Sequence, residues 1–202
     1  TIKYTGTTGY GGWGIHIAPA IASSNIMVTN NMIYDMQGDG YSSITGSSMC
    51  GILLDGASDL IKVHYNSVNL YGNYSRSTAT ITAAVYVGSS ITNLDLRDNV
   101  LVNTMVNTTT STSKSYTVYS AAANTAYSSI NYNDYYASGT QGVFGYITGA
   151  DVLDLAAWKT ATTQDANSVS GDPKFTSNTD LHIIPTELSP VNNAGTPIAG
   201  IT

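Results

Sequence analysis

Positively charged residues are scarce in this sequence. Lysine and arginine together number 7 among 202 residues, and the formal net charge is −6. Proteins that bind nucleic acid use clustered cations to displace the counterions of the phosphates. A chain with so few cations is not expected to have nucleic acid as a partner.

Cysteine is almost absent too, and no long apolar run occurs. The single cysteine, Cys50, excludes an internal disulfide and a zinc site built from several cysteines, and we expect it to be a small buried residue. No run approaches the roughly 18 apolar residues that span a bilayer, so we expect no membrane span. The glycine-rich stretch 9–14 lacks the Lys-Ser/Thr of a phosphate loop, and the histidines fall at different repeat positions. We therefore expect neither a cofactor nor a metal.

Charged residues of both signs make up only 10% of the chain, against about 25% in typical soluble proteins. Disorder does not follow, because hydrophobic residues stand at 42%. The chain is instead rich in tyrosine, glycine, threonine, serine and asparagine. This composition is typical of β-rich proteins with polar but uncharged surfaces, and it favours an extracellular or cell-surface location. The first residue is Thr1 rather than methionine, so we expect a mature product or a fragment.

An asparagine recurs at a nearly constant step along the chain. In four segments an apolar residue is followed three places later by an asparagine and then by a second strand-like run. The pairs are Val28/Asn31, Val63/Asn66, Leu96/Asn99 and Ile130/Asn133. The asparagines are separated by 35, 33 and 34 residues, which indicates a structural repeat.

A second set of positions repeats with a similar step. Alternating apolar and polar runs are centred on Ile15, Ile52, Val85 and Val118. These runs are too short for helices, and they lack the dipeptides that close β-hairpins. Stacking equivalent strands about 4.8 Å apart gives a parallel solenoid with a shared apolar interior.

The segment 51–72, GILLDGASDLIKVHYNSVNLYG, resembles the repeat of right-handed parallel β-helix proteins of the pectate-lyase type. The resemblance extends over residues 14–136. The segments 155–175 and 188–197 resemble the closing part of secreted bacterial β-helix proteins. The resemblance implies an all-β fold, a right-handed parallel β-helix of about four to six coils.

We expect one domain, residues 1–202. Residues 1–13 form an N-terminal strand or cap, 14–136 the repeated coils, and 137–202 a loop excursion with a C-terminal coil or cap. Long lateral loops are expected to leave the coils at one corner. They cover residues 35–49, 72–82, 107–116 and 137–158. Within the last, residues 152–160 predict a short helical turn that packs Leu155 and Trp158 onto the final coils.

The four asparagines are expected to form a structural ladder. At the bend between two strands a buried backbone group has no strand partner, and an asparagine amide supplies both a donor and an acceptor. Asparagine also tolerates the left-handed backbone that a tight corner can require. The ladder consists of Asn31, Asn66, Asn99 and Asn133.

Outward-facing positions, read across the coils, form columns. The first is His16, Leu53, Tyr86, Tyr119; the second Met27, Lys62, Asp95, Ser129; the third Thr29, His64, Arg97, Asn131. The columns place Lys62 beside Asp95, where the two can form an inter-coil ion pair. In a polysaccharide lyase a base removes a proton next to a carboxylate and cations stabilise the enolate. The resemblance implies a calcium cluster of carboxylates for such a lyase, but no column contains one.

A glycosidase would need two carboxylates flanking one bond. The nearest pairs in the sequence are Asp55/Asp59 and Asp95/Asp98. Asp55, Asp59 and Asp98 lie in or beside turns, where aspartate usually bonds the backbone.

Three functions remain open. The first, which we favour, is a non-catalytic extracellular module, structural or adhesive, that assembles with itself into a surface fibre. The strand-like segment 1–6 would cap its own coil or add to a neighbour, giving head-to-tail assembly. The second is a polysaccharide lyase or glycoside hydrolase that uses Lys62, His64, Asp95 and Arg97. The third is binding of surface glycans without turnover, on ring faces of Tyr41, Tyr74, Tyr86 and Tyr119.

Overall fold

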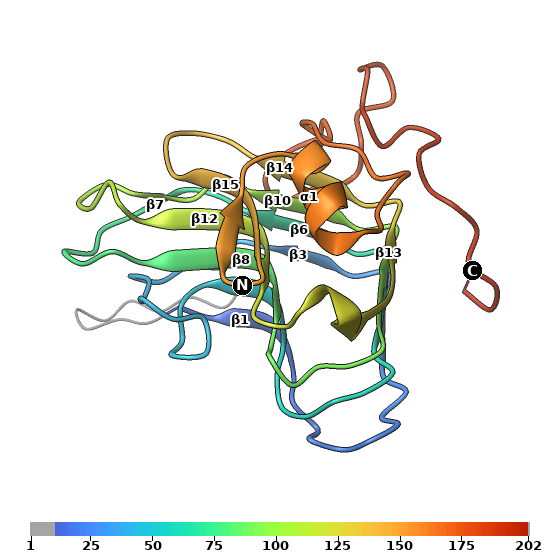
Figure 1. Cartoon of the computed structure of the whole chain (residues 1–202). Coiled ribbons are helices and arrows are strands. Elements are labelled where there is room, and N and C mark those ends of the chain that lie inside the picture. The colour runs from blue at the N-terminus through green and yellow to red at the C-terminus, as the bar shows by residue number, and fades with distance from the viewer. Residues whose placement is uncertain (1–10, 202) are drawn as a thin grey trace.

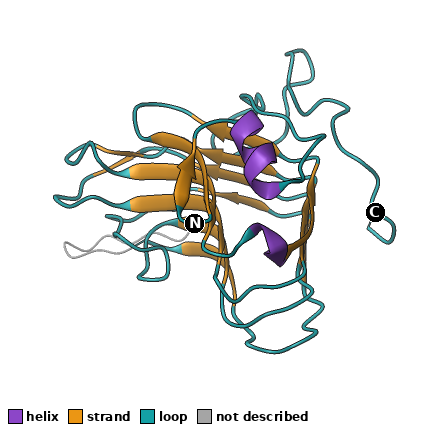
Figure 2. Cartoon of the chain, viewed as in Figure 1, coloured by secondary structure: helices purple, strands orange, loops and turns teal. Residues whose placement is uncertain are grey.

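In the computed structural model, which describes residues 11–201, the chain winds into a parallel β-solenoid of about four turns (Figures 1 and 2). The predicted right-handed parallel β-helix is confirmed. Each turn places one strand in each of three sheets, because every short alternating run buries one face and then bends. The segment predicted to cap or extend the first coil, residues 1–6, lies outside the described residues.

Sheet A is the longest of the three. Its strands are, in spatial order, β1 (Trp13–Ile17), β4 (Cys50–Leu54), β8 (Ile81–Val87), β12 (Lys114–Ser120), β15 (Gly142–Ile147) and β16 (Ala150–Val152). All neighbours pair in parallel except β15 and β16, which are antiparallel. The predicted alignment of Ile15, Ile52, Val85 and Val118 is observed. The region 137–158, predicted as a loop excursion, contributes β15 and β16.

Sheets B and C follow sheet A in every turn. Sheet B contains β2 (Met27–Thr29), β5 (Lys62–His64), β9 (Leu94–Arg97) and β13 (Tyr127–Asn131). Sheet C contains β3 (Met32–Tyr34), β6 (Ser67–Leu70), β10 (Val100–Asn103) and β14 (Asp134–Ala137). A short 3-10 helix, η1 (Asn124–Ala126), leads into β13.

The corner between sheets B and C requires a left-handed residue in every turn. These residues are Asn30, Tyr65, Asp98 and Tyr132, with φ values of 56–57°. Each comes directly before a ladder asparagine, so the left-handed residue of the corner is the neighbour of the ladder asparagine and not the asparagine itself. A non-glycine residue at such an angle is uncommon and costs energy. The bonds of the asparagine that follows offset this cost.

The predicted asparagine ladder is confirmed. Asn31 Nδ2 donates to Asn66 Oδ1 at 2.9 Å, and the equivalent bonds from Asn66 to Asn99 and from Asn99 to Asn133 are both 3.0 Å. Each of the last three side chains also donates to a backbone carbonyl of the preceding coil, at 2.9 Å. The ladder thereby satisfies corner groups that have no partner within the sheets.

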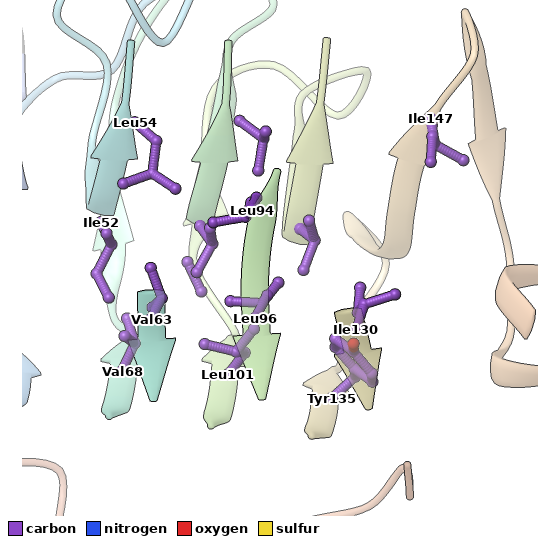
Figure 3. Packing of buried hydrophobic residues seen from close by; sticks show 14 of the residues in the cluster. Ile52, Leu54, Val63, Val68, Leu94, Leu96, Leu101, Ile130, Tyr135 and Ile147 are labelled. Carbon is purple, nitrogen blue, oxygen red and sulfur yellow. The ribbon is translucent and has the colours of Figure 1, made fainter. Parts of the chain in front are cut away.

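Aliphatic side chains from all three sheets fill the interior (Figure 3). Equivalent positions stack from coil to coil, as Val63 and Leu96 do in sheet B. Both are fully buried. Each such side chain contributes roughly 1.5–3 kcal/mol by leaving water. The interior therefore depends on the coils staying in register.

The C-terminal end of the stack is closed by a helix, α1 (Leu155–Thr162), as predicted (Figure 1). Asp154 caps it by accepting a hydrogen bond from the Ala157 amide at 2.8 Å. Trp158 is fully buried, and its indole Nε1 donates to Asp165 Oδ2 at 2.8 Å. The Tyr135 hydroxyl donates to the same oxygen at 2.6 Å. Asp165 therefore ties the helix to the final coil.

Three of the lateral loops lie side by side, as expected. Loops 72–82 and 107–116 are joined by the parallel strands β7 (Asn73–Tyr74) and β11 (Val106–Asn107). Loop 35–49 meets them through a bridge between Tyr41 and Ile81.

The last part of the chain, residues 171–201, contains no helix or strand and is called the strap below. It passes from the outer face of sheet C, where Asn69 Nδ2 donates to the Asn178 carbonyl at 3.2 Å, to sheet B. There the Tyr65 hydroxyl donates to the Thr196 carbonyl at 2.7 Å and accepts from the Ile198 amide at 2.8 Å. Asp98 Oδ1 accepts from the Thr196 amide at 2.6 Å. The strap is thus fastened at the corner between sheets B and C.

The ladder predicts that a buried asparagine in its interior contributes more to the free energy of unfolding than the half-exposed asparagine at its end. Replacing Asn99 with alanine removes the Nδ2 group that bonds among three acceptor oxygens, and it leaves the backbone N–H of Asn66 unpaired in the buried corner. We expect Asn99→Ala to lower the free energy of unfolding by about 3 kcal/mol, and Asn31→Ala, at the half-exposed end, by about 1 kcal/mol. Urea unfolding followed by circular dichroism measures both. Equal losses in the two variants would contradict a stabilising role of the buried ladder.

Candidate functional site

The charged columns predicted for sheet B are present. The neighbours across the strands are Met27, Lys62, Asp95 and Ser129 in one column, and Thr29, His64, Arg97 and Asn131 in the next. Residues 197–201 of the strap line the same cavity as these side chains, and its volume is about 560 Å³. This volume is within the range of small-molecule sites. The wall from sheet B consists of Met27, Lys62, His64, Asp95 and Arg97.

Asp95 is fully engaged by its neighbours. Arg97 donates to it through Nε and Nη2, both at 2.6 Å, in the bidentate geometry that makes strong charge-assisted bonds. His64 Nε2 lies 3.1 Å from Asp95 Oδ2. Burial alone would raise the pKa of Asp95, but the bonds from Arg97 and the contact with His64 outweigh it and lower the pKa to about 2. This carboxylate therefore stays ionised and is a weak base.

His64 and Lys62 complete the charged wall in different ways. His64 is only 1% exposed, and neither ring nitrogen has good hydrogen-bond geometry to any residue in the described part of the chain. Its contact with Asp95 becomes an ion pair when the ring is protonated. Lys62 is exposed, and among residues 11–201 the predicted Lys62–Asp95 pair is replaced by the pairs of Asp95 with Arg97 and His64. One carboxylate thus faces two permanent cations and an imidazole, which suits a ligand with negative charge.

A second, smaller cavity lies beneath the strap at the corner of sheets B and C. Its volume is about 200 Å³, and Asp98 and Asp134 both line it. Both are buried, and one oxygen of each has no hydrogen-bond partner among the described residues. Burial raises the pKa of Asp98, and it raises that of Asp134 to about 7. Burial therefore disfavours the charged form of both carboxyls.

Sequence reasoning missed Asp134. It lies directly after the ladder residue Asn133, at the position that Val100 and Ser67 take in the coils before. The sequence did contain a signal for Asp134, because it is a carboxylate at a repeat position where the other coils have uncharged residues. Asp98 does not form a catalytic pair with Asp95, because it accepts a hydrogen bond from the Thr196 amide of the strap. Asp59, expected to bond the backbone of its own turn, also connects two coils, because its Oδ1 accepts from the side chains of Thr92 at 2.9 Å and Asn93 at 2.7 Å in the next coil.

Two of the four tyrosines proposed as stacking faces, Tyr86 and Tyr119, stack on each other. On the outer face of sheet A, the ring centroids of Tyr86 and Tyr119 are 5.7 Å apart, and those of Tyr119 and Tyr146 are 4.2 Å apart. Tyr146, which lies in the predicted loop excursion, was not expected there. The placement of Tyr74 as an exposed ring is wrong, because it is only 7% exposed and belongs to the core. Tyr41 is half-buried, with the Arg76 guanidinium 5.4 Å from its ring centroid.

Leu53 and Cys50 lie on the same outer face as the tyrosines, but neither is accessible. Leu53 faces outward as expected, but both residues are fully buried because Ile44 from loop 35–49 packs over them. Within residues 11–201, no three His, Cys, Asp or Glu side chains are grouped so as to hold a metal ion. In the same range no helix has the length and apolar character needed to cross a membrane.

Asp134 makes the stability of the protein depend on pH. Its pKa is about 7 in the fold against the ordinary 3.8, so its contribution is complete below 3.8 and is lost as pH rises to 7. We expect wild type to lose about 1.4 kcal/mol per pH unit relative to Asp134→Asn across this window. Urea unfolding at several pH values measures the difference. The control Asp59→Asn should leave the slope unchanged, because hydrogen bonds from Asn93 and Thr92 lower that pKa and move its effect below the window. Parallel pH profiles of wild type and Asp134→Asn would contradict the assignment.

Comparison with known proteins identifies no relative of this chain. No family model matches the chain, and neither the curated proteins nor the solved structures contain a match to it.

Proposed function

We propose that the chain is a non-catalytic extracellular β-helix module, adhesive in role, which binds an acidic glycan in the cavity between sheet B and the strap. The sparse charge and the abundance of uncharged polar residues support an extracellular setting. The strand–asparagine–strand repeat supports kinship with the pectate-lyase-like β-helix proteins secreted by bacteria.

The state of Asp95 is the observation that carries this proposal. A lyase or hydrolase at this face would need a free carboxylate or another available base. Asp95 has a pKa of about 2 and is held by Arg97 through both oxygens, so it does not accept a proton at neutral pH. His64, the imidazole at this face, is only 1% exposed, so the face is better suited to binding than to proton transfer.

The charge balance of the cavity indicates the ligand class. Lys62 is exposed, and Arg97 keeps 27% of its side chain exposed beside the cavity. A sugar carboxylate or sulfate would accept charge-assisted hydrogen bonds from these two side chains. Specificity for acidic over neutral glycans follows from this arrangement.

A second candidate function is glycoside hydrolysis at the smaller cavity. The specific observation in its favour is the pKa of Asp134, about 7, which is suited to a general acid near neutral pH. Asp98 lines the same cavity and would be the partner carboxylate. Because the strap covers both side chains, a substrate would have to displace it, and we rank this function second.

The glycan proposal predicts selective loss of binding. We expect Lys62→Ala and Arg97→Ala each to weaken binding of an acidic oligosaccharide about tenfold or more, since each removes a charge-assisted bond. Isothermal titration calorimetry, after a glycan array has identified the ligand, measures the loss. Lys114→Ala on sheet A, where the lysine pairs with Asp151, is the matched control and should bind as wild type.

Two results would reverse this ranking. Unchanged affinity in both Lys62→Ala and Arg97→Ala would remove the proposed binding face. Release of cleaved sugar by wild type but not by Asp134→Asn, detected by chromatography, would establish the hydrolase instead.

A further inference from the structure

The two ends of the solenoid are built differently. At the C-terminal end, Gln164 bonds both the Ile130 amide and the Tyr127 carbonyl of β13, and α1 covers the last coil. At the other end, β1, β2 and β3 each pair on one side only with strands of the described chain. An unpaired strand edge offers a row of backbone donors and acceptors to another chain.

The core is also left incomplete at this end. Ile15, Ile17 and Ile26 point inward from the first coil, yet all three stay partly exposed. Their neighbours in the next coil are completely buried: Ile52, Leu54 and Ile61. The difference arises because no described coil lies beneath the first one. Apolar surface exposed together with strand edges is typical of an interface.

The asparagine ladder shows the same asymmetry. At the C-terminal end the Asn133 amide donates to Ser168 Oγ at 2.7 Å, so a side chain from outside the coils ends the ladder. At the N-terminal end Asn31 donates to Asn66 and to the Thr29 carbonyl. No residue in the range 11–201 donates to the Oδ1 of Asn31, although Oδ1 of Asn66 and Asn99 each accept two bonds. The Oδ1 of Asn31, at the N-terminal end of the ladder, therefore has no donor among the described residues.

The strands of the first coil carry no Asp, Glu, Lys or Arg. Residues 11–34, which include all of the first coil, contain no Asp, Glu, Lys or Arg. Among the exposed large apolar side chains, Ile21, Met27 and Met32 lie on this coil. Natural proteins usually protect an open edge with lysine or another charge. Such protection is missing from residues 11–34.

We propose that the first coil is an interface at which a second copy of this chain docks head to head. The net charge of −6 opposes contact between charged faces of two copies, whereas the strands of the first coil carry no Asp, Glu, Lys or Arg that would add like charges at the contact. A two-fold axis would bring the same edges and apolar side chains together, which gives a closed dimer. At the C-terminal end, residues 164–170 bond the edges of β13 and β14, so these edges are already partly occupied and do not support continued stacking. Assembly therefore stops at two copies and does not run head to tail as the sequence suggested.

Analytical ultracentrifugation of the full chain over a wide concentration range tests the proposal. We expect a monomer–dimer equilibrium whose dissociation constant rises about tenfold or more in Met32→Asp and in Ile21→Asp, because each places like charges across the interface. Leu153→Asp and Leu188→Asp, at exposed apolar residues outside the first coil, are matched controls and should dimerise as wild type. Met32→Lys repeats the test with the opposite charge, and circular dichroism checks that each variant is folded.

Several outcomes would overturn the proposal. They are a monomer at every concentration, polymers in place of dimers, and a dimer that responds to Leu153→Asp or Leu188→Asp but not to the first-coil variants. Met27 is left unchanged because it lines the cavity with Lys62. Neither Met32 nor Ile21 lines that cavity, so the glycan-binding proposal and the dimer proposal are tested independently of each other.

Discussion

The corner between sheets B and C is the constraint on which the rest of the structure depends. A chain that turns sharply beneath a closed surface leaves backbone groups with no strand partner, and such groups are costly when buried. One asparagine per coil satisfies them and also bonds its neighbours above and below. Once those amides are in line, every strand is in register, and the apolar interior and outer columns follow. The charged wall around Asp95 is one result of this alignment.

The lateral face of sheet B is a surface completed by the strap. Strands alone would leave His64 and Asp95 on an open, flat face, whereas residues 197–201 turn that face into a cavity. The strap is held by few bonds, and its burial of Asp98 and Asp134 leaves carboxyl oxygens unpaired. The cavity thus has a floor of paired strands and a wall from a segment without helix or strand, an arrangement often found where ligands bind.

Sequence reasoning was reliable wherever it rested on periodicity. The ladder, the alignment of Ile15 with Ile52, and the columns through Lys62 and Asp95 all come from residues spaced by one coil. It failed where contacts have no period. Tyr65 contacts Thr196 across 131 residues, so no local sequence pattern predicts that the strap covers His64. The sequence also did not identify the left-handed corner residue, because residues as different as Tyr65 and Asp98 take that conformation directly before a ladder asparagine.

The two residues that hold the strap have a mechanical consequence. Tyr65 and Asp98 occupy the same corner of consecutive coils, yet both bind Thr196. Tension along the solenoid axis, which would separate those coils, must therefore also stretch this bridge. The strap acts as a brace in parallel with the sheets, and it shares load at the corner where each coil is most sharply bent.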